Sequence, residues 1–250
     1  PLKSSVKPAA RKKRKRKTHA QVANDVAEAI DPAAFRIFGM RLRKWYRQNA
    51  RDLPWRKTRD PYRVLVSELM LQQTQVSRVI DFYDAFLTRF PTLNHVAESP
   101  VSHIEDQWEG LGYYARARNL HALSRVVMTS DMYAGALPSD PAALRELPGI
   151  GAYTAGAVSS FAYEKRAPLV DTNVARVLLR VFAPRFAPKS AAGQKVAWAL
   201  AEASLPRTGR DTWTHNQALM ELGALTCRAQ IRLCSGCPAA TACESVISVP

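Results

Sequence analysis

The stretch LPGIGAYTAGA, residues 147–157, decides the fold. A helix is expected to end at Leu147, because a proline and two glycines follow, and the next helix begins directly after Gly151. Glycines let the backbone amides of such a turn approach a ligand closely, and free amides at a helix N-terminus attract an anion. The stretch therefore predicts two helices joined by a hairpin within residues 144–162, with Gly149 and Gly151 at a phosphate. An ordinary turn between helices is the alternative for an isolated Gly-x-Gly.

Helical periodicity extends in both directions from this hairpin. Apolar residues recur at intervals of three and four between Phe35 and Tyr46, and again between Val76 and Leu87. Strand signals are nearly absent, since the chain has no Asn-Gly hairpin turn and the β-branched residues between 170 and 181 fit helical spacing. The sequence predicts an all-α fold.

The composition points to a polyanionic partner. The chain has 250 residues, of which 47% are hydrophobic, and its net charge is +15. No apolar stretch approaches the roughly 20 residues that cross a bilayer, so we expect a soluble, unsecreted protein without membrane contact. Such a basic surface favours nucleic acid.

Part of this charge lies in a short N-terminal segment. Residues 1–20 hold nine basic residues and no acid, including an unbroken basic run over 11–17. Such a run cannot bury enough apolar area to offset its ordering entropy, so residues 1–30 are interpreted as a basic disordered tail. A DNA-tethering arm or a nuclear-import signal is one interpretation, and a solubilising leader is the other.

The four cysteines form the most specific motif. Their spacing is C-x6-C-x2-C-x5-C, all within seventeen residues, and the chain shows no secretory feature; they are Cys227, Cys234, Cys237 and Cys243. Disulfides are therefore not expected, and four thiolates in one segment hold either a tetrahedral zinc ion or an iron–sulfur cluster. The spacing alone does not select between the two.

Two carboxyl groups stand out as a candidate catalytic pair. Glu68 is the single acid in the apolar helical run of residues 64–71, where burial should raise its pKa and keep it protonated near neutral pH. Asp171 opens another apolar helix, whose N-terminal amides would hold it as a carboxylate. An acid beside an anion is the arrangement that cleaves glycosidic bonds, although Asp171 alone is interpreted as a plain helix cap.

Long motifs resemble the adenine DNA glycosylases of the MutY family. They are SELMLQQTQV at 67–76, WEGLGYYARARNL at 108–120, the hairpin, Asp171 and the cysteine segment, in family order from roughly Phe35 to Cys243. The resemblance implies a helix-hairpin-helix glycosylase fold, with a six-helix module, a second module that holds a 4Fe-4S cluster, and the active site between them. It also implies removal of adenine mispaired with 8-oxoguanine or guanine in double-stranded DNA.

The resemblance assigns roles to individual residues. Glu68 would protonate the adenine and later handle the water, while Asp171 would stabilise the oxocarbenium ion. Tyr153 and Asn173 would form hydrogen bonds that hold Asp171. The expected DNA contacts are Gln73 beside the 8-oxoguanine, Tyr113 intercalated in the duplex, and Gly149, Gly151, Arg56 and Arg116.

Tyr153 also bears on the kind of reaction. The related endonuclease III-type enzymes have a lysine at this place, which attacks the sugar and cuts the strand. Because no amine stands here, the resemblance implies a monofunctional glycosylase with water as the final nucleophile and an abasic site as product. Lys165, further along, is interpreted as a solvated surface residue.

The resemblance implies a discontinuous organisation. Residues 31–60 and 169–250 would form the cluster module, residues 61–168 the six-helix module, and a C-terminal domain for 8-oxoguanine recognition would be absent. A monomer is expected, in the cytoplasm and nucleoid of a bacterium or in the nucleus or an organelle of a eukaryote. Two alternatives remain, a thymine/guanine mismatch glycosylase on the same scaffold and a DNA-binding module without catalysis.

Overall fold

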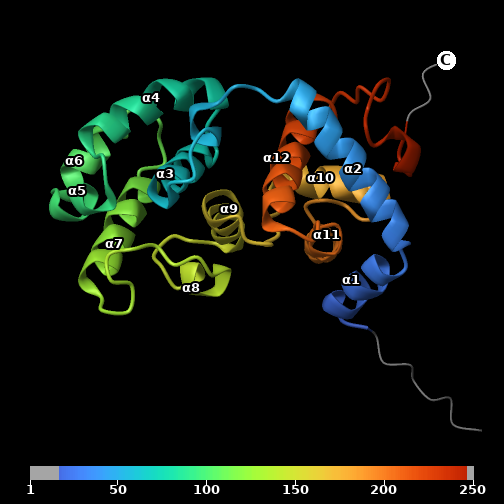
Figure 1. The fold of residues 1–250 in the computed structure, drawn as a ribbon, viewed down its shortest axis with the longest axis horizontal. Helices are drawn as coiled ribbons and strands as arrows, with labels where there is room; N and C mark the ends of the chain where they lie inside the picture. The colour runs from blue at the N-terminus through green and yellow to red at the C-terminus, as the bar shows by residue number, and fades with distance from the viewer. Residues whose placement is uncertain (1–16, 247–250) are drawn as a thin grey trace, which may run out of the picture.

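The computed structural model describes residues 17–246 and shows an almost entirely helical protein (Figure 1). Within these residues no strand forms, and a single bridge between Cys227 and Arg232 is the one β-type pairing, so the all-α prediction is confirmed. The helices are α1 (His19–Glu28), α2 (Pro32–Asn49), α3 (Pro61–Leu71), α4 (Val76–Arg89), α5 (Leu93–Glu98), α6 (Val101–Asp106), α7 (Ala115–Thr129), α8 (Pro141–Arg145), α9 (Ala152–Tyr163), α10 (Thr172–Phe182), α11 (Ala191–Ala203) and α12 (Gly209–Leu225), with 3₁₀ turns at Pro54–Arg56 and Ala240–Ala242.

The helices gather into two lobes, with α9 between them (Figure 1). In one lobe, α3 packs on α4, α7 and α9, while α5 and α6 pack on α7. In the other lobe, α1 packs on α11, and α2 and α10 pack on α12. The chain passes between the lobes twice, through residues 50–60 and 164–171, and both passages border the pocket described below.

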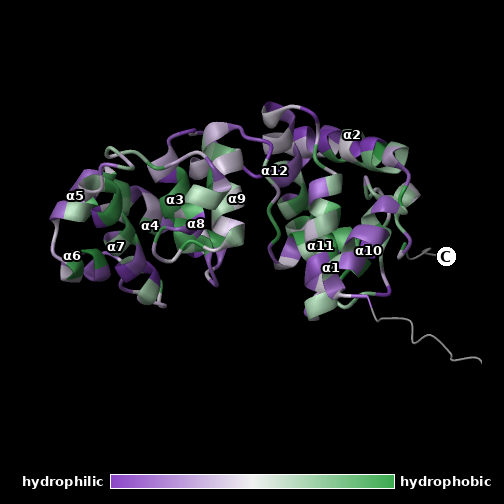
Figure 2. Ribbon diagram, turned by 90° about the horizontal axis from the view of Figure 1, so that it is seen from below, coloured by the Kyte–Doolittle hydropathy of each residue, from purple (hydrophilic) through white to green (hydrophobic). Residues whose placement is uncertain are grey.

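Each lobe buries the apolar faces of its helices. Figure 2 shows apolar positions turned inward in both lobes and polar positions outward. The α2 stripe predicted from the sequence packs on α10, where the rings of Phe35 and Phe38 lie 4.9 and 5.3 Å from that of Phe182. In the other lobe the rings of Phe86 and the fully buried Trp108 meet edge to face at 5.6 Å. Such edge-to-face contacts fix orientation as well as burying area.

The N-terminal segment differs from the predicted tail. The structure describes it only from residue 17 onward, so the basic run at 11–16 lies outside the described residues. Residues 19–28 form α1, which begins with a capping box between Thr18 and Gln21. Ala23 and Val26 are buried, because an apolar face on α1 packs against α11. The disordered assignment of residues 17–30 was wrong, since the basic composition upstream masked a short amphipathic helix.

The hairpin between α8 and α9 forms where the sequence predicted it. Gly149 has φ of 76°, a left-handed conformation that favours glycine, and Ile150 is buried beneath the turn. Gly151 is the N-cap residue of α9 and offers no side chain to its first amides. Further along α9, a Cβ on Gly156 would lie 2.1 Å from the carbonyl oxygen of Pro168, so α9 packs directly against the second passage between the lobes.

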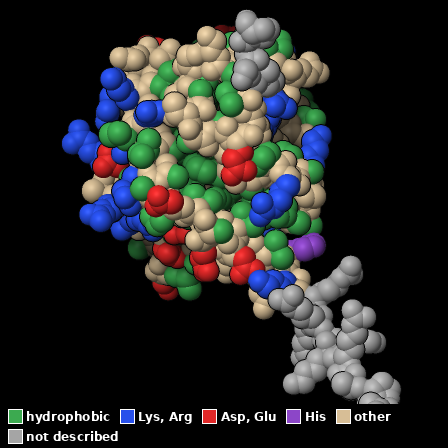
Figure 3. Space-filling model, turned by 90° about the vertical axis from the view of Figure 1, so that its right-hand side faces the viewer, with side chains coloured by type: hydrophobic (Ala, Val, Ile, Leu, Met, Phe, Trp, Pro, Cys, Tyr) green, Lys and Arg blue, Asp and Glu red, His purple; other side chains and the backbone are tan. Residues whose placement is uncertain are grey.

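None of the helices in residues 17–246 is long and apolar enough to cross a membrane. Figure 3 views the end of the molecule formed by the lobe that contains α1, α2 and α10. Apolar side chains lie in the centre of this face, and basic and acidic side chains both stand around them. This end is therefore of mixed charge despite the basic composition of the chain.

Candidate active site

A pocket of about 210 Å³ opens between the two lobes. Its walls come from five parts of the chain: the first passage, the second half of α3 with the turn that follows, the first turn of α9, the start of α10, and α12. The structure brings all four predicted catalytic residues to this pocket, namely Glu68, Tyr153, Asp171 and Asn173. They are up to 105 residues apart in sequence. Packing of α9 on α3 brings Tyr153 to Glu68, and the meeting of the lobes adds Asp171 and Asn173.

Glu68 lies in the middle of α3 and is 3% exposed. Burial raises the pKa of its carboxyl to about 7, and the nearby negative charge of Asp171 adds to this effect. The hydroxyl of Tyr153 donates a 2.7 Å hydrogen bond to Oε2 of Glu68 and acts in the opposite direction. Close to neutral pH this carboxyl is therefore able both to give and to accept a proton.

Asp171 is the N-cap residue of α10. Its Oδ1 accepts a 2.6 Å hydrogen bond from the amide of Val174, and its Oδ2 accepts one of 3.0 Å from Nδ2 of Asn173. Burial raises the pKa of Asp171 above the usual aspartate range, while these hydrogen bonds act to lower it. The expected cap is present, but desolvation makes the carboxylate harder to ionise than the sequence suggested. Asp171 still accepts more hydrogen bonds than Glu68. Of the two carboxyl groups, Asp171 is therefore the one more readily ionised.

A further hydrogen-bonded connection leads from Asp171 to the cysteine segment. Asn173, which donates to Asp171, accepts a 2.8 Å hydrogen bond from Arg176 at its Oδ1. The same arginine donates to the carbonyl oxygens of Cys227 at 2.9 Å and of Gly223 at 2.8 Å. The side chain beside the aspartate is thus oriented by contacts with the segment that carries the cysteines.

Several pocket residues were missed by the sequence analysis. Glu221 on α12 is fully buried and accepts hydrogen bonds from both Arg51 and Arg56 at 2.7 Å. Burial acts to raise the pKa of Glu221, but the two guanidinium groups outweigh it and lower the pKa to about 2. Like Glu68, Glu221 is the single acid in an apolar helical run, here residues 218–225 in the second half of α12, and that signal could have found it. The pocket also contains Trp55 and Gln217.

Two arginines expected on the DNA lie inside the protein instead. Arg56 binds Glu221, and its Nε donates to Gln217 at 3.0 Å, so it forms part of the pocket wall. Arg116 is 6% exposed and directs its guanidinium to carbonyl oxygens of its own lobe. Both guanidinium groups therefore already have acceptors within the fold, and a direct contact of Arg56 or Arg116 with DNA stays a prediction.

The other candidate DNA contacts stand at the surface. Gln73 and Tyr113 are exposed, Tyr113 by 58%, and both have left-handed backbone conformations with φ of 59° and 51°. Residues other than glycine adopt this conformation at a cost, so two such residues in neighbouring loops point to a functional constraint. Gly149 and Gly151 lie at the hairpin, where a Cβ on Gly151 would meet no atom within 4 Å.

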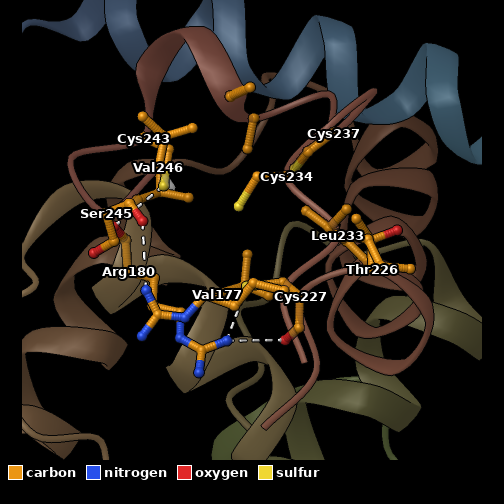
Figure 4. Close-up of a pocket in the computed structure, with 15 residues that line it drawn as sticks. Val177, Arg180, Thr226, Cys227, Leu233, Cys234, Cys237, Cys243, Ser245 and Val246 are labelled. Carbon is orange, nitrogen blue, oxygen red and sulfur yellow. Dashed lines mark hydrogen bonds between the residues drawn. The ribbon is translucent and has the colours of Figure 1, made fainter. Parts of the chain in front are cut away.

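The four cysteines surround a common space next to α10 (Figure 4). All four are free thiols in the structure. The guanidinium of Arg180 lies beside them, with a 3.3 Å contact to Sγ of Cys227 and a hydrogen bond of 2.7 Å to the carbonyl oxygen of Arg228. Within residues 17–246, no group of three or more histidine, cysteine or acidic side chains is placed to hold a single metal ion.

Comparison with known proteins places these features in one family. Residues 66–201 match the HhH-GPD superfamily of base excision DNA repair proteins. The adenine DNA glycosylase of Homo sapiens is 41% identical over 225 residues, which are 86% of this chain and 40% of the human protein. The chain thus spans less than half the length of that relative.

Two further matches cover more of the other protein. The adenine DNA glycosylase of Mycolicibacterium smegmatis is 43% identical over 204 residues, which cover 81% of this chain and 67% of the bacterial protein. The solved structure of a thermostable thymine-DNA glycosylase superimposes with a TM-score of 0.77 at 31% identity, over 86% of this chain and 97% of the other.

Proposed function

Because this chain belongs to the HhH-GPD superfamily of base excision DNA repair proteins, and within it to the adenine DNA glycosylases, we propose that it excises adenine from DNA by hydrolysis. The observation that carries the proposal is the pairing of Glu68 and Asp171 in one pocket between the lobes. We propose adenine opposite 8-oxoguanine or guanine in double-stranded DNA as the substrate, bound by a monomer.

The position of the pocket requires that the base leave the duplex. An adenine inside the double helix cannot reach Glu68, which is almost fully buried, so the nucleotide must rotate out of the stack. Tyr113 and Gln73 are the exposed groups that would fill the resulting gap, Tyr113 by stacking and Gln73 beside the opposite base. Free amides at the start of α9, next to Gly151, would hold a backbone phosphate.

The chemistry follows from the two carboxyl groups. Protonated Glu68 donates its proton to the adenine, the bond between the base and C1′ of the sugar breaks, and the bonding electrons leave with the neutral base. The sugar is left as an oxocarbenium ion, which the carboxylate of Asp171 stabilises. Glu68, now ionised, accepts a proton from the water that attacks C1′, and an abasic site is the product.

The residues near the pocket support a reaction without a covalent intermediate. Tyr153 occupies the first turn of α9, where its hydroxyl is engaged with Glu68. Lys165 is exposed beyond the other end of α9, about 18 Å along a twelve-residue helix. Neither α9 nor the residues that follow it place an amine close enough to form a Schiff base with the sugar. Strand cleavage is therefore not expected.

The cysteine segment fits an iron–sulfur cluster. The four thiols face one space next to α10, and four cysteine thiolates are the ligand set that a 4Fe-4S cluster requires. We propose Cys227, Cys234, Cys237 and Cys243 as its ligands. When bound, the cluster would supply a rigid link for the segment whose Cys227 carbonyl binds Arg176.

A thymine specificity is the second candidate, because one structural relative is a thymine-DNA glycosylase. The sequence relatives of higher identity are adenine glycosylases, which favours adenine. A DNA-binding module without catalysis would need neither buried carboxyl. The cost of burying Glu68 in the pocket argues for its use in chemistry.

Single-turnover base release from three duplexes tests the proposal. They hold adenine opposite 8-oxoguanine, adenine opposite guanine, and thymine opposite guanine, with alkali added to cut abasic sites and borohydride to trap any Schiff base. We expect adenine release, strand breaks only after alkali, and no trapped complex. Glu68→Gln should slow release by about a hundredfold or more, whereas Glu202→Gln, at an exposed ion pair, should not. Thymine release, or binding without release of either base, would contradict the proposal.

A further inference from the structure

One buried guanidinium joins the two loops that carry Gln73 and Tyr113. The first loop follows α3, and Nη1 of Arg116 faces only this part of the chain. Its acceptors are the carbonyl oxygens of Leu69 at 2.9 Å, Met70 at 2.7 Å and Gln72 at 2.6 Å, and the hydroxyl of Thr74 at 3.1 Å. These acceptors include carbonyls at the end of α3, which have no partner within the helix.

The other side of the same guanidinium faces the second loop. Nη2 of Arg116 donates to the carbonyl oxygens of Leu111 at 3.3 Å and Gly112 at 2.8 Å, and Nε lies 3.4 Å from that of Tyr113. The guanidinium also lies 5.5 Å from the ring centre of Tyr113 and 5.6 Å from that of Trp108. A planar group with five donors thus spans the gap between the loops.

No carboxylate pairs with Arg116 among the described residues, so carbonyl dipoles, one hydroxyl and the neighbouring aromatic rings compensate the buried charge. A buried cation with this arrangement is costly unless its acceptors stay in place. Both loops contain a residue in a left-handed conformation, which costs on the order of 1 kcal/mol each and persists only where the surroundings fix it. The contacts of Arg116 provide that fixation on both sides.

We propose that Arg116 is a positioning residue that fixes the distance between Gln73 and Tyr113, so that both side chains enter the duplex together. Through the carbonyl of Leu69 it also fixes the turn of α3 next to Glu68. Recognition of the mispair and the placement of the acid are thereby connected through one side chain. This inference rests on the proposed function, since it assigns Gln73 and Tyr113 to DNA.

Arg116→Lys is the informative substitution. It keeps the positive charge, but its three donors share one nitrogen and cannot span both loops. Arg118→Lys is the matched control, because Arg118 is two residues away on the same helix and forms an exposed ion pair with Glu105. Circular dichroism would establish that both variants retain the helical fold.

The measurement uses a duplex that cannot be cleaved. It holds 2′-fluoro-2′-deoxyadenosine opposite 8-oxoguanine, with fluorescent 2-aminopurine next to it to report unstacking. For Arg116→Lys we expect about a tenfold loss of the preference for this duplex over an undamaged one, corresponding to one charge-assisted hydrogen bond. The 2-aminopurine signal should fall, while binding to undamaged DNA stays within about twofold. Arg118→Lys should match the wild type in all three measurements.

A double-mutant cycle separates positioning from general stability. If Arg116 acts through the second loop, Arg116→Lys should cost less preference in a Tyr113→Ala background than in the wild type. Additive effects, an unchanged 2-aminopurine signal, or equal losses on both duplexes that parallel a loss of helicity would overturn the inference. If the wild type releases adenine and Arg116→Lys matches the wild type in these measurements, the positioning role is refuted while the proposed function stands. A wild type without mispair preference or base release would remove the proposed function and the inference together.

Discussion

The hydroxyl of Tyr153 and Oε2 of Glu68 lie 2.7 Å apart and join α9 to α3 across the pocket. The tyrosine therefore stands between the helix-hairpin-helix element and the acid of the proposed reaction. Its hydroxyl has Glu68 as its acceptor, and the pKa of Tyr153 is raised well above its ordinary value by burial and by the charge of Glu68. Tyr153 therefore keeps its proton near neutral pH and donates it in the hydrogen bond to Glu68.

Removal of this donor should change the pH dependence of catalysis. The bond from Tyr153 lowers the pKa of Glu68, so Tyr153→Phe should raise that pKa and move the alkaline fall in the excision rate to higher pH. The maximal rate should drop by about tenfold, since the acid loses one oriented hydrogen bond. Tyr163→Phe removes a hydroxyl at the other end of α9, which binds the carbonyl of Leu137, and should leave the pH profile unchanged. Identical profiles for wild type and Tyr153→Phe would contradict this.

The wild-type rate itself should depend on pH through Glu68. The pKa of about 7 means that the acid is protonated below neutral pH and loses its proton above it. Single-turnover excision should therefore fall about tenfold per pH unit above 7. A rate that stays constant from pH 7 to pH 9 would exclude Glu68 as the proton donor.

The same group should make stability depend on pH. The pKa of Glu68 in the folded protein is about 7, above its ordinary 4.5, so its favourable contribution is complete below about pH 4.5 and is lost as pH rises through 7. The loss amounts to about 3 kcal/mol. Glu68→Gln should therefore stabilise the protein at pH 8 relative to the wild type more than at pH 5. Urea denaturation at the two pH values measures this difference.

Glu221 should be the most important carboxylate for stability. Glu221→Ala leaves Arg51 and Arg56 without their shared buried partner, and we expect a loss of about 3 to 5 kcal/mol in the free energy of unfolding. Glu202→Ala removes one exposed ion pair with Arg166 and should cost under about 1 kcal/mol. Because the pKa of Glu221 is lowered to about 2, its contribution is present above pH 4.5 and is lost as pH falls towards 2. Equal losses in the two variants would contradict the buried role.

The metal content of the purified protein tests the cluster. We expect about four iron atoms and four acid-labile sulfides per chain, without a stoichiometric zinc ion. Cys237→Ser should lower the iron content and destabilise the lobe that contains α10, while the helical content of the other lobe is retained. One zinc per chain, displaced by a chelator without loss of iron, would instead identify a tetrahedral zinc site.

Local signals allowed the sequence to predict much of the fold and part of the site. Helical periodicity located α2 and α4, the hairpin motif located the start of α9, and an acid within an apolar helix identified Glu68. Asp171 was found because N-caps have a short-range pattern. Each of these features depends on residues within a few turns of one another, so sequence spacing is enough to reveal them.

The errors arose where the partner is distant in sequence. The resemblance assigned Arg56 and Arg116 to DNA, yet both side chains have acceptors within the fold that lie up to 165 residues away and come together only in the folded chain. The partners of Glu221 are likewise distant in sequence, on the first passage between the lobes, although its place in an apolar helical run was visible in the sequence. The composition of residues 11–17 concealed α1, whose burial depends on α11, more than 160 residues downstream.

The division of one lobe between the two ends of the chain imposes an order on biosynthesis. Helix α2 leaves the ribosome about 120 residues before α10 and about 160 residues before α12, the two helices on which it packs. Synthesis of that length takes on the order of ten seconds, so α2 stays without its native core for that time. The lobe containing α3 to α9 has all its partners by then and is able to fold first. During that interval the apolar stripe of α2 has no native partner. A chaperone that binds nascent apolar segments would therefore act mainly on α2 at this stage. Substitutions that lower the hydrophobicity of α2 would reduce aggregation of the nascent chain but also lower the stability of the folded protein.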